Sequence, residues 1–591
     1  MKIGRIVSGF FTALALCLML AVLELNKNTV IGWVLTLTTA ACYLLLRHKA
    51  RGKGPLRFLC AAGWLACFAG ILFLTWPPVK RVPAVEGKTG GPTEIVRLRD
   101  GDVRGVRTAD GAVEIFAGIP YAAPPEGDLR WREPADPEPW EGVLEADSFA
   151  PMSMQPVNLP IHDSLVQIIG YHDYKISLRD NFRAPVSEDA LYVNVWKPKG
   201  DAVGLPVLVY VHGGSLQTGQ PWYGDYSGEG LARKGVIVVN MGYRLGVFGY
   251  LALEELAAES EHGTTGNYGL LDQIKALEWV RDNIAAFGGD PGNVTLAGES
   301  AGAASVSALC TSPLASGLFR RVILESSTLA SVKPPHSFRL FDEALVSGRE
   351  LMERHGVSTA AELRALSAES LVDEAYTQHH ITVDGYALTE TPYESHRRGV
   401  FNAEAILHGY NLHESGAFLV FDHTDIPTFE SRVKDYFGEY ADEVFALYPV
   451  STDKEADEAW REIWGAVFFD YPHYCLNRLA VENGIPVWEY LFSKENGRLG
   501  SWHSGEEVYF YGNVPEKSRV YTVSDRILCD IASECFAAFA REGTPHRLWE
   551  QNLTSEDLME FSGKNAGGAK MTKEWKLPLY EILDRMDGWG E

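Results

Sequence analysis

Three long apolar runs at the start of the chain place the strongest constraint on its fold. They cover residues 6–23, 30–46 and 58–76, and none of them contains Lys, Arg, Asp or Glu. Each run is close to the ~20 residues that a helix needs to cross the hydrocarbon core of a bilayer. We therefore predict three transmembrane helices in a membrane anchor of residues 1–85, followed by a soluble domain of residues 86–591.

The first run has a second interpretation, a cleaved signal peptide, because Lys2 and Arg5 form a basic leader in front of it. The run ends in Ala-Val-Leu-Glu at residues 21–24, without the small-x-small pattern of a cleavage site. Two further apolar runs follow it. These observations favour three retained helices.

Positive charges in the loops predict the orientation of the anchor. The loop between the second and third runs contains five cations: Arg47, Lys49, Arg51, Lys53 and Arg57. The first loop instead pairs Lys27 with Glu24. Since Lys and Arg beside a span tend to stay in the cytoplasm, the second loop is expected there and the chain after Trp76 is expected to be extracytoplasmic. Lys80 and Arg81 oppose this orientation.

The rest of the chain is strongly acidic. Residues 1–85 carry ten Lys or Arg and a single acid, so the other 506 residues have a formal charge of -34. A surface of this sign repels phosphate backbones, which argues against binding of nucleic acid.

The cysteines do not form a recognisable framework. Four lie in the apolar runs, and the other four are spread over the acidic part of the chain: Cys310, Cys475, Cys529 and Cys535. This is too few for a disulfide scaffold, and no CxxC pair or His cluster suggests a metal site. We expect neither a metal nor a cofactor.

Short apolar runs alternate with helical patterns from about residue 94 onward. Residues 206–212 and 235–241 are continuous apolar runs of strand length, as buried parallel strands require. Residues 270–287 repeat apolar side chains at helical spacing, and residues 293–297 form another short β-like run. The alternation predicts an α/β domain with a large, mostly parallel central sheet flanked by helices.

The sequence Gly-Glu-Ser-Ala-Gly at residues 298–302 matches the pattern G-x-S-x-G. It follows a β-like run and precedes a helix start rich in small residues, which is the context of a nucleophile elbow. Glycines flank the serine there because the strained turn leaves no room for side chains. Ser300 is therefore predicted to be a nucleophile.

An ester-cleaving serine also needs donors for the oxyanion of its tetrahedral intermediate. The sequence Val-His-Gly-Gly-Ser at residues 211–215 ends an apolar strand upstream of the elbow, where such a loop belongs. The predicted donors are the backbone N–H groups of Gly214, Ser215 and Ala301.

Several side chains near these loops have two interpretations. Leu216, Trp222 and Tyr223 follow the oxyanion loop and could form an apolar pocket wall or belong to the core. Glu299 could supply a negative field near the substrate or be a hydrogen-bonded residue of the elbow.

Histidine is scarce in the last third of the chain. Beyond residue 413 there are four: His423, His473, His503 and His546. His503 lies between Gly500 and Gly505, in a loop that could place an imidazole over a cleft. It is the favoured base, whereas composition does not select the acid.

Five further motifs occur in order along the chain: FAGIPYA at 116–122, LRW at 129–131, SEDALYVNVW at 187–196, GNYGLLDQ at 266–273 and FGGDP at 287–291. Through these motifs, residues 94–591 resemble the type-B carboxylesterase and cholinesterase family of α/β-hydrolases. The family places its triad acid in a segment similar to residues 409–414 and its histidine in one similar to 503–506. The resemblance implies an α/β-hydrolase fold, with Glu414 as the acid and His503 as the base of an acyl-enzyme mechanism.

The chain departs from the family pattern at three places. Ser415 replaces the glycine after the acid, and Ser215 replaces the third glycine of the oxyanion loop. Ser153 and Ala190 occupy the expected cysteine positions of the family's first disulfide, which implies that this bridge is lost at both ends.

The leading hypothesis is a membrane-anchored serine esterase that acts on a small-molecule ester, with its catalytic domain on the extracytoplasmic side. The alternative is a non-catalytic, cholinesterase-like binding or adhesion module. The presence of Ser300, Glu414 and His503 together favours the enzyme. The motifs assign neither the ester nor an oligomeric state.

Overall fold

The structure of the chain is a computed structural model. It describes residues 2–85, 87–166, 168, 181–372, 379–495, 497, 499–518, 520–547, 549–563 and 568–589. Two compact units are present, one of residues 1–81 with 157–185 and one of residues 82–156 with 186–591. The first unit therefore includes a segment, 157–185, that is distant in sequence from the N-terminal residues of the same unit.

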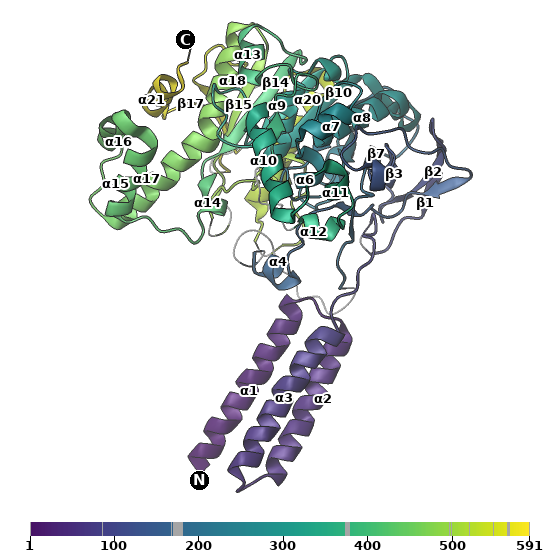
Figure 1. Cartoon of the computed structure of the whole chain (residues 1–591), viewed down its shortest axis with the longest axis vertical. Coiled ribbons are helices and arrows are strands. Elements are labelled where there is room, and N and C mark those ends of the chain that lie inside the picture. Colours follow the sequence, from purple (N-terminus) through teal and green to yellow (C-terminus); the bar gives the residue numbers. More distant parts are fainter. Residues whose placement is uncertain are drawn as a thin grey trace. The chain divides into compact units, whose positions relative to one another are not determined.

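The first unit is built on three helices that lie side by side (Figure 1), α1 (Lys2–Leu25), α2 (Val30–Lys49) and α3 (Gly54–Leu74). The N-terminus of α1 and the turn between α2 and α3 are at the same end of this bundle (Figure 1). The short helix α4 (Pro160–Val166) contacts α1, and the side-chain amide of Asn181 donates to the carbonyl oxygen of Asn28.

Two helices of the described residues, not three, are long and apolar enough to cross a membrane. These are α2 and α3, whereas the apolar part of α1, Gly9–Leu25, is shorter. That part of α1 rises about 25 Å, which falls short of a hydrocarbon core of about 30 Å. The prediction of three membrane-spanning helices is corrected to two candidates.

The second unit contains a large central sheet. Along the sheet the strands follow the order β1 (Pro92–Arg97), β2 (Asp102–Arg107), β3 (Val113–Pro120), β7 (Tyr192–Pro198), β9 (Ile237–Met241), β8 (Leu205–Val211), β10 (Gly289–Glu299), β11 (Arg321–Glu325), β14 (Ala405–Asn411), β15 (Val487–Phe492), β16 (Asp557–Phe561) and β17 (Ala569–Lys573). All neighbours from β9 to β16 are parallel, and antiparallel pairs occupy the two edges. The predicted mostly parallel sheet is confirmed.

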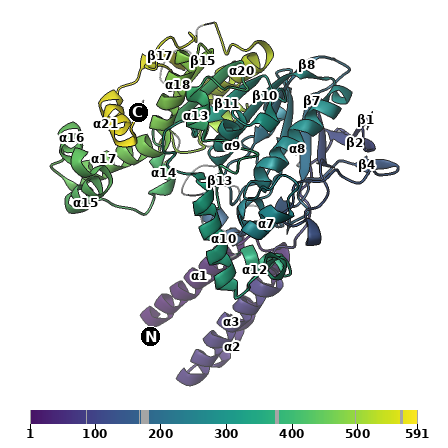
Figure 2. The same ribbon diagram turned by 45° about the horizontal axis from the view of Figure 1, so that its top comes forward.

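Helices pack on the strands that carry the core. Figure 2 shows α8 (Tyr268–Asn283) and α9 (Ala301–Leu309) alongside the strands of the sheet. Helix α9 contacts β8, β10 and β11, and α20 (Val523–Glu542) contacts β8 and β10. Strand β8 from Val207 onward and the whole of β9 are buried, as strands covered on both faces require.

Candidate active site

Ser300 occupies the sharp turn between β10 and α9. Its φ of 55° and ψ of -126° are strained for a residue with a side chain. A Cβ on Gly298 would lie 2.6 Å from the carbonyl carbon of Gly302, and a Cβ on Gly302 would lie 2.0 Å from the carbonyl oxygen of Val211. The turn therefore accepts only glycine at both positions, which explains the G-x-S-x-G pattern.

His503 connects Ser300 with Glu414. Its Nε2 lies 2.8 Å from Ser300 Oγ, and its Nδ1 lies 2.6 Å from Glu414 Oε2. Ser300 and Glu414 follow the parallel strands β10 and β14, whose carboxyl ends meet at one edge of the sheet. Ser300 and His503 are 203 residues apart in the sequence, and the fold brings both of them together with Glu414.

Glu414 is buried and hydrogen-bonded on both oxygens. Its Oε1 accepts the backbone N–H of Asn411 at 2.7 Å, while Oε2 faces His503. Burial raises the pKa of Glu414, and the hydrogen bond from the backbone N–H of Asn411 acts in the opposite direction. The hydrogen bond to Oε1 therefore holds the carboxyl group in an orientation that points Oε2 toward the imidazole.

Glu299 lies against the other ring nitrogen. Its Oε1 is 3.2 Å from His503 Nε2 and accepts a hydrogen bond of 2.6 Å from Ser504 Oγ. Burial raises the pKa of Glu299 to about 7, against the attraction of His503. Glu299 is thus hydrogen-bonded to Ser504 and also contacts His503, and its role toward the substrate remains a prediction.

Further buried carboxyl groups surround this site, and sequence reasoning missed them. Glu506 Oε1 accepts from Ser326 Oγ at 3.0 Å, and Glu506 is also hydrogen-bonded to the side chain of Asn411. Burial, followed by repulsion from Glu414, raises the pKa of Glu506 to about 7. Its place three residues after His503 was the one available signal.

The predicted oxyanion loop lies directly against the serine turn. A Cβ on Gly213 would be 2.9 Å from Ser300 Cβ, so the two loops are in close contact. Gly214 and Ser215 have φ values of 108° and 57°. Within the described residues, the backbone N–H groups of Gly214, Ser215 and Ala301 donate no hydrogen bond to the protein.

The residues that follow the oxyanion loop differ in their surroundings. Leu216 is fully buried in the main core cluster, and Trp222 stacks on Phe149 with ring centroids 5.5 Å apart. Tyr223 is 39% exposed. A pocket-wall role for Leu216, Trp222 and Tyr223 remains a prediction.

Other aromatic side chains contact the imidazole instead. Phe469 lies in η6 (Ala466–Asp470), a π-helical turn, with its ring centroid 4.7 Å from that of His503. Phe418, the last residue of α14 (Ser415–Phe418), has its ring centroid 5.0 Å from His503. No pattern in the sequence marks a π-helical turn, so these contacts were not predicted.

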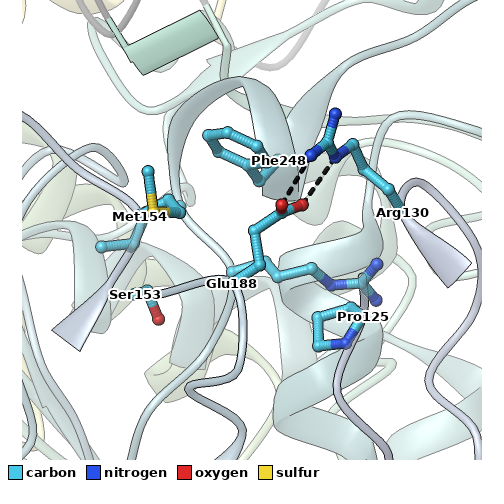
Figure 3. A pocket seen from close by; sticks show the side chains of 8 residues that line it. Pro125, Arg130, Ser153, Met154, Glu188 and Phe248 are labelled. Carbon is cyan, nitrogen blue, oxygen red and sulfur yellow. Dashed lines mark hydrogen bonds and ion pairs between the residues drawn. The ribbon is translucent and has the colours of Figure 1, made fainter. Parts of the chain in front are cut away.

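Ser153, one of the two predicted replacements of a cysteine, lines a small pocket (Figure 3). Its hydroxyl donates to the carbonyl oxygen of Tyr243 at 2.6 Å. Figure 3 shows that the neighbouring Glu188 forms a two-pronged ion pair with Arg130, with both N–O distances at 2.6 Å. This largely buried pair joins the segment of Arg130 to that of Glu188 with paired, charge-assisted hydrogen bonds.

No group of three or more His, Cys, Asp and Glu side chains in the described part of the chain is arranged to hold a metal ion. The site is thus built from a strained serine, a histidine, a buried carboxylate and a glycine-rich loop at the edge of a mostly parallel sheet. This combination fits an α/β-hydrolase fold.

The family model described as "Carboxylesterase family" matches residues 92–576, and the chain belongs to this family. It is similar to the fumonisin B1 esterase of Sphingopyxis macrogoltabida, with 32% identity over 557 residues that cover 88% of this chain and 97% of the relative. It is also similar to the para-nitrobenzyl esterase of Bacillus subtilis (strain 168), with 32% identity over 474 residues that cover 76% of this chain and 90% of the relative. The protein is a carboxylic ester hydrolase.

Proposed function

We propose that the protein is a serine carboxylesterase in which Ser300, His503 and Glu414 form the catalytic triad. The observation that carries this proposal is the position of His503, within hydrogen-bond distance of both partners. His503 accepts the proton of Ser300 as the hydroxyl attacks the ester carbonyl, and Glu414 stabilises the resulting imidazolium. The alcohol leaves with that proton, and water activated by His503 then hydrolyses the acyl-enzyme.

The oxyanion of each tetrahedral intermediate is stabilised by the N–H groups of Gly214, Ser215 and Ala301. These groups have no acceptor among the described residues, and their loops lie beside Ser300. Pre-oriented donors of this kind cost no reorganisation during the reaction. The mechanism requires neither a metal nor a cofactor.

A non-catalytic binding module is the less favoured alternative. Such a module would have no need for the strained backbone of Ser300, which costs of the order of 1–3 kcal/mol. It would also have no need for a histidine held between a serine and a buried glutamate. The two relatives are both named as esterases, one for fumonisin B1 and one for para-nitrobenzyl esters. We propose a small-molecule carboxylic ester as the substrate class.

Covalent labelling tests the nucleophile directly. A fluorophosphonate probe should label the wild-type protein once and should fail to label Ser300→Ala, which should also lose ester hydrolysis while melting at the same temperature. Ser316→Ala, at an exposed serine outside the site, is the matched control and should behave as wild type. Labelling or near-normal turnover in Ser300→Ala would overturn the mechanism.

We also propose that residues 1–85 anchor the enzyme in a membrane, with the esterase domain of residues 86–591 on the extracytoplasmic side. Helices α2 and α3 have the length and composition for this role. The five cations between Arg47 and Arg57 would hold their connecting turn in the cytoplasm. The chain then leaves α3 on the outside, whether or not α1 crosses the membrane. Protease added to intact cells should remove the domain, and protection until the membrane is breached would reverse the orientation.

A further inference from the structure

A pocket of about 370 Å³ lies among the three N-terminal helices, in the unit that contains none of the catalytic residues. Its size is in the range of small-molecule sites, which is about 300–1,000 Å³. It is lined by Phe11 and Thr12 of α1, Tyr43 and Arg47 of α2, and Arg57 and Trp64 of α3. Arg47 in the last turn of α2 and Arg57 in the first turn of α3 place one end of the pocket next to the α2–α3 turn.

Two guanidinium groups belong to the lining near that turn. Arg47 donates a 2.6 Å hydrogen bond to Thr12 Oγ1, and its guanidinium carbon lies 5.9 Å from the centre of the Tyr43 ring. Arg57 is in the first turn of α3 and is exposed. Guanidinium groups match the geometry of phosphate oxygens and bind them with paired hydrogen bonds.

The deeper part of the lining is aromatic. The rings of Tyr43 and Trp64 are stacked, with centroids 4.6 Å apart and planes 9° from parallel. Trp64 is only 6% exposed, and its Nε1–H has no hydrogen-bond acceptor within the described residues. Trp64 is seven positions after Arg57 in α3, a rise of about 10 Å along the helix axis. The pocket therefore combines a cationic end with an apolar wall and one buried donor that lacks an acceptor.

We propose that this pocket binds an anionic phospholipid of the leaflet that contacts the α2–α3 turn. Arg47 and Arg57 bind the phosphate, and the glycerol ester region lies beside Tyr43 and Trp64, where a lipid carbonyl can accept the Trp64 Nε1–H. Basic pockets between transmembrane helices on the cytoplasmic side are suited to anionic head groups. A free phosphate ion satisfies only the cationic end, so the aromatic wall favours a lipid. The inference rests on the proposed membrane anchor.

Native mass spectrometry of the full-length protein in detergent tests this site. Dioleoylphosphatidylglycerol, dioleoylphosphatidylcholine and inorganic phosphate are added separately, and the bound fraction of each is measured. We expect phosphatidylglycerol to bind more tightly than phosphatidylcholine, and phosphate to bind weakly. In the double variant Arg47→Gln/Arg57→Gln the ratio of phosphatidylglycerol affinity to phosphatidylcholine affinity should fall by about fivefold or more. A fivefold change is the effect of a single cation near anionic lipid.

Matched variants separate a site from general charge. Arg51→Gln/Lys53→Gln removes the same number of charges from the same turn but no residue that lines the pocket, and it should keep the preference. Trp64→Phe keeps the ring and removes the donor, and it should weaken phosphatidylglycerol binding while the ester-hydrolysis rate stays unchanged.

Three results would overturn the proposal: equal binding of the two lipids, equal loss of preference in both double variants, or phosphate binding as strong as that of the lipid. Carbonate extraction of membranes distinguishes these failures from failure of the anchor. A protein that resists extraction but lacks lipid preference is anchored without a lipid site, whereas a protein that is extracted lacks the anchor itself.

Discussion

The substitution Glu414→Gln tests how the buried acid controls His503. Glu414 Oε1 accepts the N–H of Asn411 at 2.7 Å, so the new amide must keep its carbonyl oxygen at that position. Its NH₂ group then replaces Oε2, which is 2.6 Å from His503 Nδ1. A donor at this distance requires an unprotonated Nδ1, so the imidazole proton moves to Nε2. His503 can then no longer accept the proton of Ser300.

The expected loss combines the wrong tautomer with the loss of a charge that stabilises the imidazolium. Together they should lower turnover by about 10²–10⁴-fold, or about 3–5 kcal/mol of transition-state stabilisation. The fold should be retained because the change preserves shape and removes no apolar contact. Steady-state hydrolysis of a chromogenic ester gives kcat, and thermal unfolding of the same preparations reports the fold.

Asp422→Asn is the matched control. Asp422 is partly exposed and is paired with Arg432, with N–O distances of 2.8 and 3.1 Å, away from the imidazole. A surface pair of this kind contributes little, so turnover should stay close to wild type. The reasoning is refuted if Glu414→Gln keeps more than about a tenth of wild-type turnover, or if Asp422→Asn is the more damaging change.

Three further outcomes follow from the geometry. The kcat/KM of Glu299→Gln should match that of wild type below about pH 6 and fall increasingly behind it above about pH 7. Burial raises the pKa of Glu299 to about 7, and only the ionised carboxylate stabilises the imidazolium 3.2 Å away. Parallel kcat/KM profiles of the two proteins would contradict this. Ser215→Gly should keep activity because glycine tolerates a φ of 57°. Gly214→Ala should abolish activity because the new Cβ would lie 2.2 Å from the carbonyl oxygen of Thr218. Equal turnover of the two variants would count against the assignment of this loop as the oxyanion loop. Burial lowers the pKa of His408 to about 3, so this histidine is protonated in the unfolded chain before the folded one as pH falls below about 6.5. Wild type should therefore lose about 2 kcal/mol of unfolding free energy from this group by about pH 5. Urea unfolding of His408→Gln should lack that loss.

The parts of the site that depend on backbone chemistry could be predicted from the sequence. Gly298 and Gly302 are required because a Cβ at either position would lie within 2.0–2.6 Å of neighbouring backbone atoms. The G-x-S-x-G pattern therefore predicts the sharp turn at Ser300. The parallel strands could be predicted for a similar reason, since a strand covered on both faces must be apolar throughout. Glu414 came from the family resemblance, because acidic side chains are too common in this chain to be selected by composition.

The parts that depend on contacts between distant segments could not be predicted. Residues 157–185 belong to the same unit as the N-terminal helices, although about 80 residues separate them from α3. The contacts of Phe418 and Phe469 with His503 join segments that carry no shared pattern. The prediction that α1 crosses the membrane was wrong because it rested on the absence of charged residues. The apolar part of this helix, Gly9–Leu25, is too short for a candidate span.

The buried carboxyl groups around His503 give the site a specific electrical property. Burial raises the pKa of Glu299 and Glu506 to about 7, and repulsion from neighbouring carboxylates adds to the rise. One imidazolium cannot neutralise three carboxylates, so close to neutral pH Glu299 and Glu506 retain protons that exposed glutamates would lose. Each proton lost as pH rises adds a negative charge near the imidazolium that the proposed mechanism forms at His503. The rate of this esterase should therefore respond to pH through the carboxyl groups as well as through the histidine, which is why the Glu299→Gln profile is informative beyond a single residue.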